Sequence, residues 1–88
     1  MLVVDKDLKV LDSASRDHKQ ITPKPGWVEH DPQEIYDNIV ACLKEVCDRN
    51  SLTSDNVVSI GITNQRETTL AFDRVTGKAI TNAVVWLD

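Results

Sequence analysis

Apolar side chains recur at helical spacing along the middle of the chain, in residues 31–50. Steps of three and four residues place side chains on one face of a helix. The apolar residues that follow this spacing, or lie directly beside it, are Ile35, Ile39, Cys42, Leu43 and Val46. The pattern therefore predicts one helix, with these five residues on its buried face.

Both ends of this segment carry helix-boundary signals. Asp31 is suited to the N-cap, because its carboxylate can accept backbone N–H bonds, and Pro32 suits the first helical position. Glu34 follows three residues after the cap, as in a capping box, and its charge complements the helix dipole. We expect the helix to end near Asn50, with that residue in the left-handed conformation. Capping thus accounts for Asp31 and Glu34.

Short apolar runs before the helix predict a β-hairpin. The first run is Leu2-Val3-Val4, a second begins near Lys9, and a polar turn at residues 5–7 separates them. Residues 22–27, TPKPGW, contain two prolines and one glycine. We expect this stretch to form an extended connection to the helix.

Three further strands are predicted after the helix. Residues 56–63 are apolar on both faces, as in an interior strand of a covered sheet. Residues 68–72 and 80–86 read as two more strands, joined by a turn at residues 73–78 in which Gly77 supplies a positive φ. The predicted order is β-β-α-β-β-β, which is an α/β or α+β unit with the helix packed on a sheet.

Composition and charge narrow the function classes. The chain has 88 residues, of which 41% are hydrophobic and 27% charged, and this suits one small domain. A net charge of −4 argues against nucleic acid or an anionic membrane as the main partner. No stretch reads as a spanning helix or a signal peptide. Cys42 and Cys47 lie five residues apart, which is neither a metal-binding nor a disulfide pattern, so we expect reduced core thiols in a cytoplasmic protein.

Four polar residues, NQRE at positions 64–67, separate two strand-like runs. Adjacent residues on a strand point to opposite faces, so Arg66 and Glu67 can address one ligand only if the chain bends after Thr63. A solvated hairpin turn is the ordinary alternative, but this stretch contains neither glycine nor proline. Arginine offers several donors in one plane and glutamate offers acceptors. The pair therefore matches a diol, whose hydroxyls each donate and accept.

Two longer stretches resemble the FGGY carbohydrate kinase family, and within it the glycerol kinases. They are PKPGWVEHDPQEI at residues 23–35 and IGITNQRETT at residues 60–69. TGK at residues 76–78, NAVVW at residues 82–86 and the terminal Asp88 fit the same family, in its order and spacing. The element GWVEHDP is shared with other FGGY kinases. NQRETT is the version typical of glycerol kinases, whereas xylulose kinases typically carry a Gly-Gln-Met-His type of sequence.

This resemblance implies a substrate site for glycerol. Arg66 and Glu67 would hydrogen-bond the hydroxyls, and Trp86 would pack its ring against the carbon chain. A small polyol has little apolar surface, so its affinity must come from paired hydroxyls beside an aromatic wall. Composition alone would make Trp86 a core aromatic at the end of a strand. His18 and His30 have no spaced partner for metal or triad chemistry, so we expect solvated or cap-adjacent roles for them.

The resemblance also implies what lies outside this sequence. ATP and Mg²⁺ are the family's cofactors, and we expect no binding residues for either here, nor a catalytic residue, nor a metal ligand. The implied fold is a ribonuclease H-like (actin-like) domain, present in part and without the first phosphate-binding strand and turn. We expect the partner to be the remainder of a kinase chain, with homo-oligomers possible, and we expect the isolated segment to be inactive and marginally folded. A kinase of another small polyol or sugar, and a non-catalytic remnant or interaction module, remain alternatives.

Overall fold

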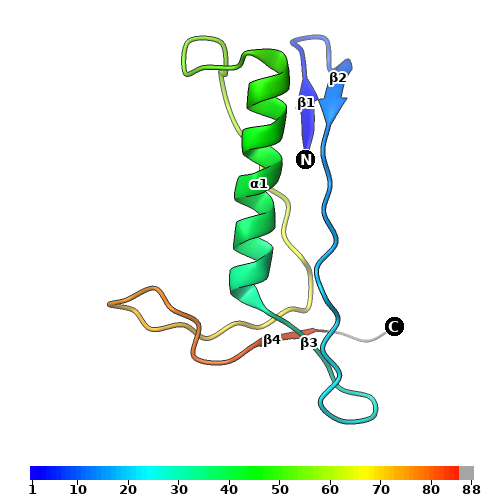
Figure 1. Cartoon of the computed structure of the whole chain (residues 1–88), viewed down its shortest axis with the longest axis vertical. Coiled ribbons are helices and arrows are strands. Elements are labelled where there is room, and N and C mark those ends of the chain that lie inside the picture. The colour runs from blue at the N-terminus through cyan, green and yellow to red at the C-terminus, as the bar shows by residue number, and fades with distance from the viewer. Residues whose placement is uncertain (86–88) are drawn as a thin grey trace. The chain divides into compact units, whose positions relative to one another are not determined.

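The computed structural model describes residues 1–85 and contains one helix and two small antiparallel sheets (Figure 1). The elements, in chain order, are β1 (Leu2–Val4), β2 (Val10–Ser13), β3 (Val28–His30), α1 (Pro32–Asn50) and β4 (Ala83–Val85). The chain forms two compact units: Met1–Asp17 with Asp37–Thr63, and His18–Tyr36 with Asn64–Asp88. Nowhere in residues 1–85 does a helix combine the length and apolar character needed to cross a bilayer.

The predicted amino-terminal hairpin is confirmed. β1 and β2 pair antiparallel, with Leu2 opposite Ser13. The Asp5 carboxylate closes the turn, because its Oδ1 accepts hydrogen bonds from the backbone N–H groups of Asp7 (2.9 Å) and Lys9 (3.0 Å). Leu8 adopts a positive φ of 62° in this turn, a conformation that costs a side-chain-bearing residue energy.

The start of α1 follows the sequence signals. Asp31 Oδ1 accepts the Gln33 N–H at 2.9 Å, and Pro32 is the first helical residue. The expected capping box is only half formed among the described residues. Glu34 accepts the backbone N–H of Lys19 at 2.9 Å, so its carboxylate joins the helix to the preceding connection.

α1 ends at Asn50 as predicted, but the left-handed residue lies one position later than expected. Asn50 remains helical, and the left-handed residue is Ser51, with a φ of 52°. The Leu52 N–H donates to the Cys47 carbonyl at 2.9 Å, which is the bond of a Schellman ending. The Asn50 amide explains the shift, because it donates to the Val46 carbonyl (2.8 Å) and to the Asp12 carboxylate (2.7 Å). These bonds hold Asn50 in the last helical turn.

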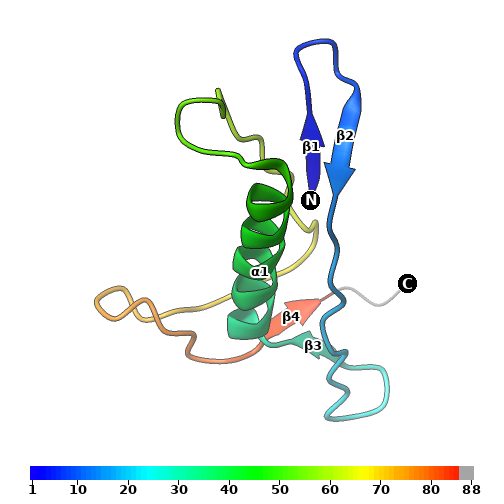
Figure 2. The ribbon, with the colours of Figure 1, turned by 45° about the horizontal axis from the view of Figure 1, so that its top comes forward.

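Within the first unit, the hairpin packs beside the helix (Figures 1 and 2). Ala14, Cys42 and Val46 form a small buried cluster, and Val3 packs against it. Both cysteines are free thiols, with Cys42 buried and Cys47 half-buried. The cluster is small, so polar contacts around it carry part of the contact between hairpin and helix.

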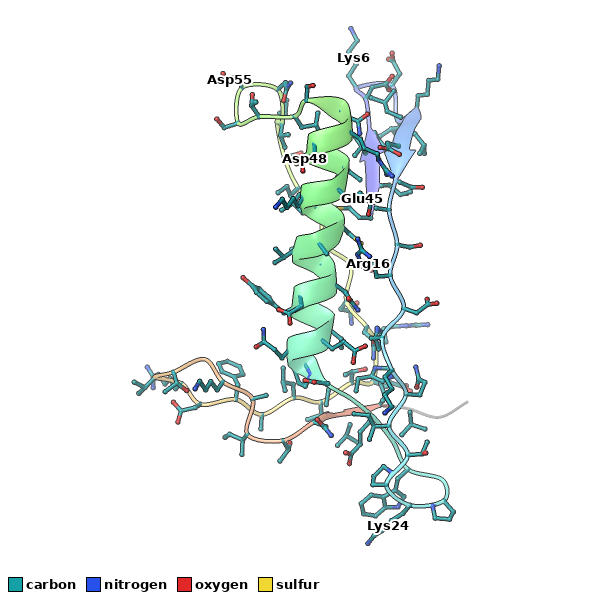
Figure 3. All side chains as sticks on the ribbon, in the orientation of Figure 1. Lys6, Arg16, Lys24, Glu45, Asp48 and Asp55 are labelled. Atoms are coloured by element: carbon teal, nitrogen blue, oxygen red, sulfur yellow. The ribbon has the colours of Figure 1, made fainter. Side chains whose placement is uncertain are left out.

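A chain of ion pairs supports this packing (Figure 3). The Arg49 guanidinium binds both carboxylate oxygens of Asp12, at 3.0 and 3.1 Å, and reaches Glu45 at 2.9 Å. Arg16 pairs with Glu45 at 3.3 Å. The hydrogen bond from Asn50 lowers the pKa of Asp12, with further lowering from the Ser13 N–H and from Arg49. The Asp12 carboxylate is therefore held in its charged form between hairpin and helix.

The predicted buried face of the helix is partly wrong. Cys42 and Val46 are buried and Ile35 is half-buried, but Ile39 is 53% exposed and Leu43 42%. The hairpin covers the flank that carries Cys42 and Val46. Ile39 and Leu43 lie on a neighbouring flank of the helix and are only about half covered.

The second unit is built around β3 and β4, which Figure 2 shows as neighbouring arrows. His30 pairs with Ala83, and Glu29 with Val84. Val84 also exchanges backbone hydrogen bonds with Thr69, at 3.0 and 2.9 Å. Thr69 is thereby fixed to the edge of the β3–β4 pair, only two residues after Glu67.

The predicted turn at residues 73–78 is confirmed. Asp73 Oδ1 accepts the N–H groups of Val75 and Thr76, at 2.8 and 2.9 Å, and Gly77 has the expected positive φ of 74°. The bonds from Thr76 and Val75 lower the pKa of the Asp73 carboxyl. This turn is satisfied by its own backbone and needs no ligand.

The predicted strand order is confirmed only in part: β4 lies within the strand expected at residues 80–86, but the other two strands expected after the helix do not form in residues 1–85. Residues 56–63 form no ladder, and Val58 and Ile62 in this segment are 99% and 92% exposed. Residues 68–72 make only isolated bridges, Thr69 to Val84 and Phe72 to Ala79, while β3 forms before the helix, where only an extended connection was expected. A strand is stable only beside a hydrogen-bonded neighbour, and no described segment pairs with residues 56–63.

Candidate functional site

The chain turns sharply at Arg66 and Glu67, within the NQRE stretch. Glu67 has a positive φ of 56°, so the two residues do not belong to a continuous extended strand. The alternation that would send their side chains to opposite faces of a sheet therefore does not apply here. The bend that the sequence required after Thr63 is present in the structure.

Both charged side chains are exposed. Among residues 1–85, no hydrogen bond or ion pair engages the Arg66 guanidinium or the Glu67 carboxylate, although several exposed charges elsewhere are paired. The donors of Arg66 and the acceptors of Glu67 are thus available to a ligand. The third predicted site residue, Trp86, lies outside the described residues.

A turn with an available guanidinium next to an available carboxylate can bind a polar molecule that both accepts and donates. Arg66 can donate two bonds in one plane, and Glu67 can accept from hydroxyl protons. Vicinal hydroxyl groups satisfy both requirements at once. The arrangement has the chemistry of a polyol-binding loop.

His30, at the end of β3, holds the start of this turn and was not predicted as a site residue. The side chain is only 5% exposed, and Gln65 Nε2 lies 3.2 Å from its Nδ1. The His18 Nε2 lies 3.0 Å from the same nitrogen, and Gln20 Oε1 lies 2.9 Å from His30 Nε2. The expected solvated or cap-adjacent role is therefore wrong for His30, which is buried and bonded on both ring nitrogens.

The bond pattern fixes the state of the His30 ring. Gln20 Oε1 can only accept, so His30 Nε2 carries the proton and Nδ1 is the acceptor. Burial lowers the pKa of His30, the neighbouring His18 lowers it further, and Glu34 opposes them. The ring is accordingly neutral near pH 7. The inward direction of the His30 side chain could have been predicted if residues 28–30 had been read as a strand, because Val28 and His30 would then share one face. The sequence instead led us to expect an extended connection up to the helix.

Gln65 links His30 to the far side of the turn. Its Nε2 donates to Thr68 Oγ1 at 2.9 Å, and that hydroxyl donates to the Arg66 carbonyl at 3.3 Å. Thr69 then pairs with Val84. The turn is therefore held on both sides of Arg66 and Glu67, and the two charged side chains themselves take no part in holding it.

A separate hollow in the second unit has a volume of about 770 Å³ and does not include Arg66 or Glu67. Its lining residues are Asp31, Pro32, Gln33, Tyr36, Leu70, Phe72, Gly77, Lys78, Ala79, Ile80, Thr81 and Asn82. The one carboxylate in it, Asp31, is used in capping α1. Size alone does not make this hollow the candidate site, because its one carboxylate is already engaged in capping.

Metal binding was tested against the same residues. Across residues 1–85, no group of three or more His, Cys, Asp or Glu side chains is arranged to hold a metal ion. We therefore assign no described residue to Mg²⁺.

Comparison with known proteins identifies one family. The N-terminal domain model of the FGGY family of carbohydrate kinases matches residues 1–88. The glycerol kinase of Corynebacterium glutamicum (strain R) is 47% identical over 87 residues, which are 99% of this chain and 17% of that protein. The glycerol kinase of Escherichia coli (strain K12 / DH10B) is 48% identical over 85 residues, which are 97% of this chain and 17% of that protein.

A solved structure shows the same similarity in three dimensions. The crystal structure of Plasmodium falciparum glycerol kinase with ADP matches with a TM-score of 0.86 and 42% sequence identity. The match covers 99% of this chain and 18% of that chain. The sequence thus spans less than a fifth of the length of these relatives.

Proposed function

The chain belongs to the FGGY family of carbohydrate kinases, and from this premise we propose that it is part of an ATP-dependent glycerol kinase and contributes the glycerol-binding turn. The observation that carries the proposal is the turn at Arg66 and Glu67, where an available guanidinium and an available carboxylate lie side by side in sequence. The relatives support glycerol as the substrate, because they are glycerol kinases at 46–48% identity.

In this proposal the residues of the turn bind and orient the acceptor. Arg66 donates to glycerol oxygens, and Glu67 accepts from glycerol hydroxyls. Trp86, outside the described residues, lines the carbon chain. When bound, ATP with Mg²⁺ supplies the phosphoryl group that makes glycerol 3-phosphate and leaves ADP. Because catalysis of phosphoryl transfer rests largely on positioning, holding one hydroxyl in line with that group is the contribution of this segment.

The fold proposal follows from the same premise. We propose that the complete domain is ribonuclease H-like and that residues 56–63 form an interior strand in it. Their apolar residues on both faces support this, as does the 99% exposure of Val58 when no neighbour is present. The remainder of the kinase chain would supply the missing strands and the sites for ATP and Mg²⁺.

The test uses a full-length kinase in which residues 1–88 replace the matching segment of the Escherichia coli relative, called the chimaeric kinase below. We expect it to phosphorylate glycerol. Arg66→Ala should lower kcat/KM for glycerol by roughly 10- to 150-fold, because charged hydrogen bonds are worth about 1.5–3 kcal/mol. The KM for ATP should not change. Steady-state kinetics with coupled detection of ADP measures the glycerol kinase activity, the kcat/KM for glycerol and the KM for ATP.

Arg74→Ala is the matched control, since Arg74 is an exposed arginine in the turn that follows Phe72. It should leave kcat/KM for glycerol unchanged within about two-fold, as surface substitutions do. Equal losses for Arg74→Ala and Arg66→Ala would contradict a specific role of Arg66. A folded chimaeric kinase without activity would overturn the kinase assignment and favour a non-catalytic remnant or interaction module.

A kinase of another small polyol or sugar is the second candidate, because NQRE chemistry alone matches any diol. A substrate panel on the chimaeric kinase separates the two. We expect glycerol to be preferred over analogues that lack one hydroxyl by about 100-fold or more, because such analogues leave Arg66 or Glu67 unpaired. A tetritol or a pentose used better than glycerol would reassign the substrate.

A further inference from the structure

We propose that His30 is a positioning residue for the substrate turn, and that it acts through Gln65 to hold Arg66 and Glu67 toward the acceptor. This inference rests on the proposed function and extends it to residues that do not touch the substrate. It starts from a bond that joins a buried imidazole to an exposed turn, His30 Nδ1 to Gln65 Nε2 at 3.2 Å.

The imidazole is a fixed point. His30 pairs with Ala83 in the β3–β4 ladder, its side chain is buried, and its Nε2 is bonded to Gln20 at 2.9 Å. The His18 ring packs edge-on against it, with ring centroids 4.2 Å apart. The His18 Nε2 lies 3.0 Å from His30 Nδ1, the nitrogen that also faces Gln65. A side chain held from several sides has little freedom, so the Gln65 amide bonded to it is also held in place.

Gln65 transmits this position to the turn. One amide N–H of Gln65 is directed to His30 Nδ1, and the other donates to Thr68 Oγ1 at 2.9 Å. Gln65 and Thr68 flank Arg66 and Glu67, so the amide bridges the turn from one side to the other. Without this bridge, only the Thr68 bond to the Arg66 carbonyl and the pairing of Thr69 with Val84 would restrain the turn, in which Glu67 has a positive φ of 56° that a non-glycine residue leaves readily.

The chemistry requires an acceptor at the Nδ1 position of residue 30. The Gln65 amide nitrogen can only donate, so the partner atom must accept. Neutral imidazole with its proton on Nε2 meets this need, as does an asparagine side chain, whose Oδ1 lies at the same branch position as Nδ1. Phenylalanine keeps the buried ring but has no acceptor. The two substitutions therefore separate hydrogen bonding from packing.

The experiment compares His30→Asn and His30→Phe in the chimaeric kinase. We expect His30→Phe to raise the glycerol KM by roughly three- to ten-fold, the worth of one neutral hydrogen bond, and His30→Asn to restore most of it. The KM for ATP should stay constant in both. A role in packing alone predicts the opposite order, because asparagine leaves a cavity and phenylalanine does not.

Gln65→Leu keeps the experiment decisive if the buried substitution prevents folding. It removes the same bond from the exposed side together with the bond to Thr68, so we expect at least the same rise in glycerol KM. The double variant with His30→Phe should have a glycerol KM no higher than Gln65→Leu alone, because Gln65→Leu already removes the bond to His30. Additive effects, or an unchanged glycerol KM in Gln65→Leu, would overturn the proposal.

Two outcomes distinguish this inference from the proposed function beneath it. If Arg66→Ala abolishes most activity while His30→Phe and Gln65→Leu behave as the unmodified chimaeric kinase, the positioning role is wrong and the glycerol-binding turn stands. If Arg66→Ala has no effect, the proposed function itself fails, whatever the His30 variants show.

Discussion

Glu67 combines a functional charge with an unfavourable backbone conformation. Its φ is 56°, and a left-handed conformation costs a non-glycine residue about 1–2 kcal/mol. Strain of this kind is common at binding sites, where the surroundings hold a side chain in a useful direction. Here the surroundings are the bonds of Gln65 to His30 and Thr68. Glycine would remove the strain together with the carboxylate.

We therefore predict opposite effects of Glu67→Gly on stability and substrate binding. The turn should open less readily, by about 0.5–1 kcal/mol, because glycine adopts positive φ freely. The glycerol KM should rise by roughly ten-fold or more, because the acceptors for the hydroxyls are lost. Hydrogen exchange of the turn amides and steady-state kinetics of the chimaeric kinase measure the two effects.

Leu8→Gly provides the matched control for this prediction. Leu8 has a φ of 62° in the β1–β2 turn, so glycine should stabilise that turn by a similar amount, about 0.5–1 kcal/mol. It should leave the glycerol KM unchanged. A raised glycerol KM in Leu8→Gly would show that the effect at Glu67 comes from backbone freedom and not from the carboxylate.

The buried His30 ring gives the stability a pH dependence of known sign. Burial, reinforced by His18 and opposed by Glu34, lowers its pKa in the folded protein. The unfolded chain therefore binds a proton first as the pH falls below the ordinary histidine pKa of about 6.5. The stabilisation is fully present above that pH and is lost as the pH falls through the lowered pKa. Thermal unfolding of the chimaeric kinase between pH 7.5 and 5, with His30→Asn as reference, should show the difference, and parallel curves would contradict it.

The sequence indicates some residues of the site and not others, for physical reasons. Arg66 and Glu67 are adjacent in sequence, and adjacent side chains on a strand point to opposite faces. The sequence therefore indicated that a bend is needed for both to contact one ligand. His30 acts through partners 12 and 35 residues away, His18 and Gln65. Spacing along the chain carries no information about such a pair, and only the pairing of β3 with β4 directs the His30 ring inward.

Among the elements, the helix and the strands β1, β2 and β4 could be predicted, but β3 was missed, and the strands expected at 56–63 and 68–72 do not form in residues 1–85. The bounds of α1 depend on bonds within a few residues, such as Asp31 to Gln33 and Leu52 to Cys47. A strand depends on partners far away in sequence, and residues 56–63 show the consequence. Their pattern is that of an interior strand, yet no described segment pairs with them. The apolar pattern indicates that a segment is buried between neighbouring strands, but it does not show which segments those neighbours are.

The ending of α1 allows a prediction of its own. Ser51 occupies the left-handed position of a Schellman ending, where glycine is preferred. Ser51→Gly should stabilise the last turn by about 0.5–1 kcal/mol, and this slows amide exchange there by roughly two- to five-fold. Ser51→Ala is the control and should give no gain, because alanine carries the same Cβ penalty. Equal exchange rates in the glycine and alanine variants would contradict the prediction.

At the scale of the whole molecule, the described chain buries few large apolar side chains. The buried hydrophobic residues among positions 1–85 are Ala14, Cys42, Val46 and Ala83. Val58, Ile60 and Ile62 expose most of their apolar surface, and Ile39 and Leu43 on the helix expose about half of theirs. Burial of apolar surface is the main favourable contribution to folding. So small a buried set leaves little stability for the segment on its own.

We therefore predict that the isolated 88-residue chain unfolds in urea without a steep transition and associates as its concentration rises. Ile60→Lys should reduce light scattering by the isolated chain, because a charge interrupts its exposed apolar run. The same substitution should prevent folding of the chimaeric kinase, where this segment is proposed to lie inside a sheet and a lysine would be buried without a partner. Opposite effects of one substitution in the two contexts are the expected signature of a strand that lacks its neighbours. A cooperative, monomeric transition of the isolated chain, with a slope of about 1 kcal/mol/M or more, would show instead that the segment folds by itself.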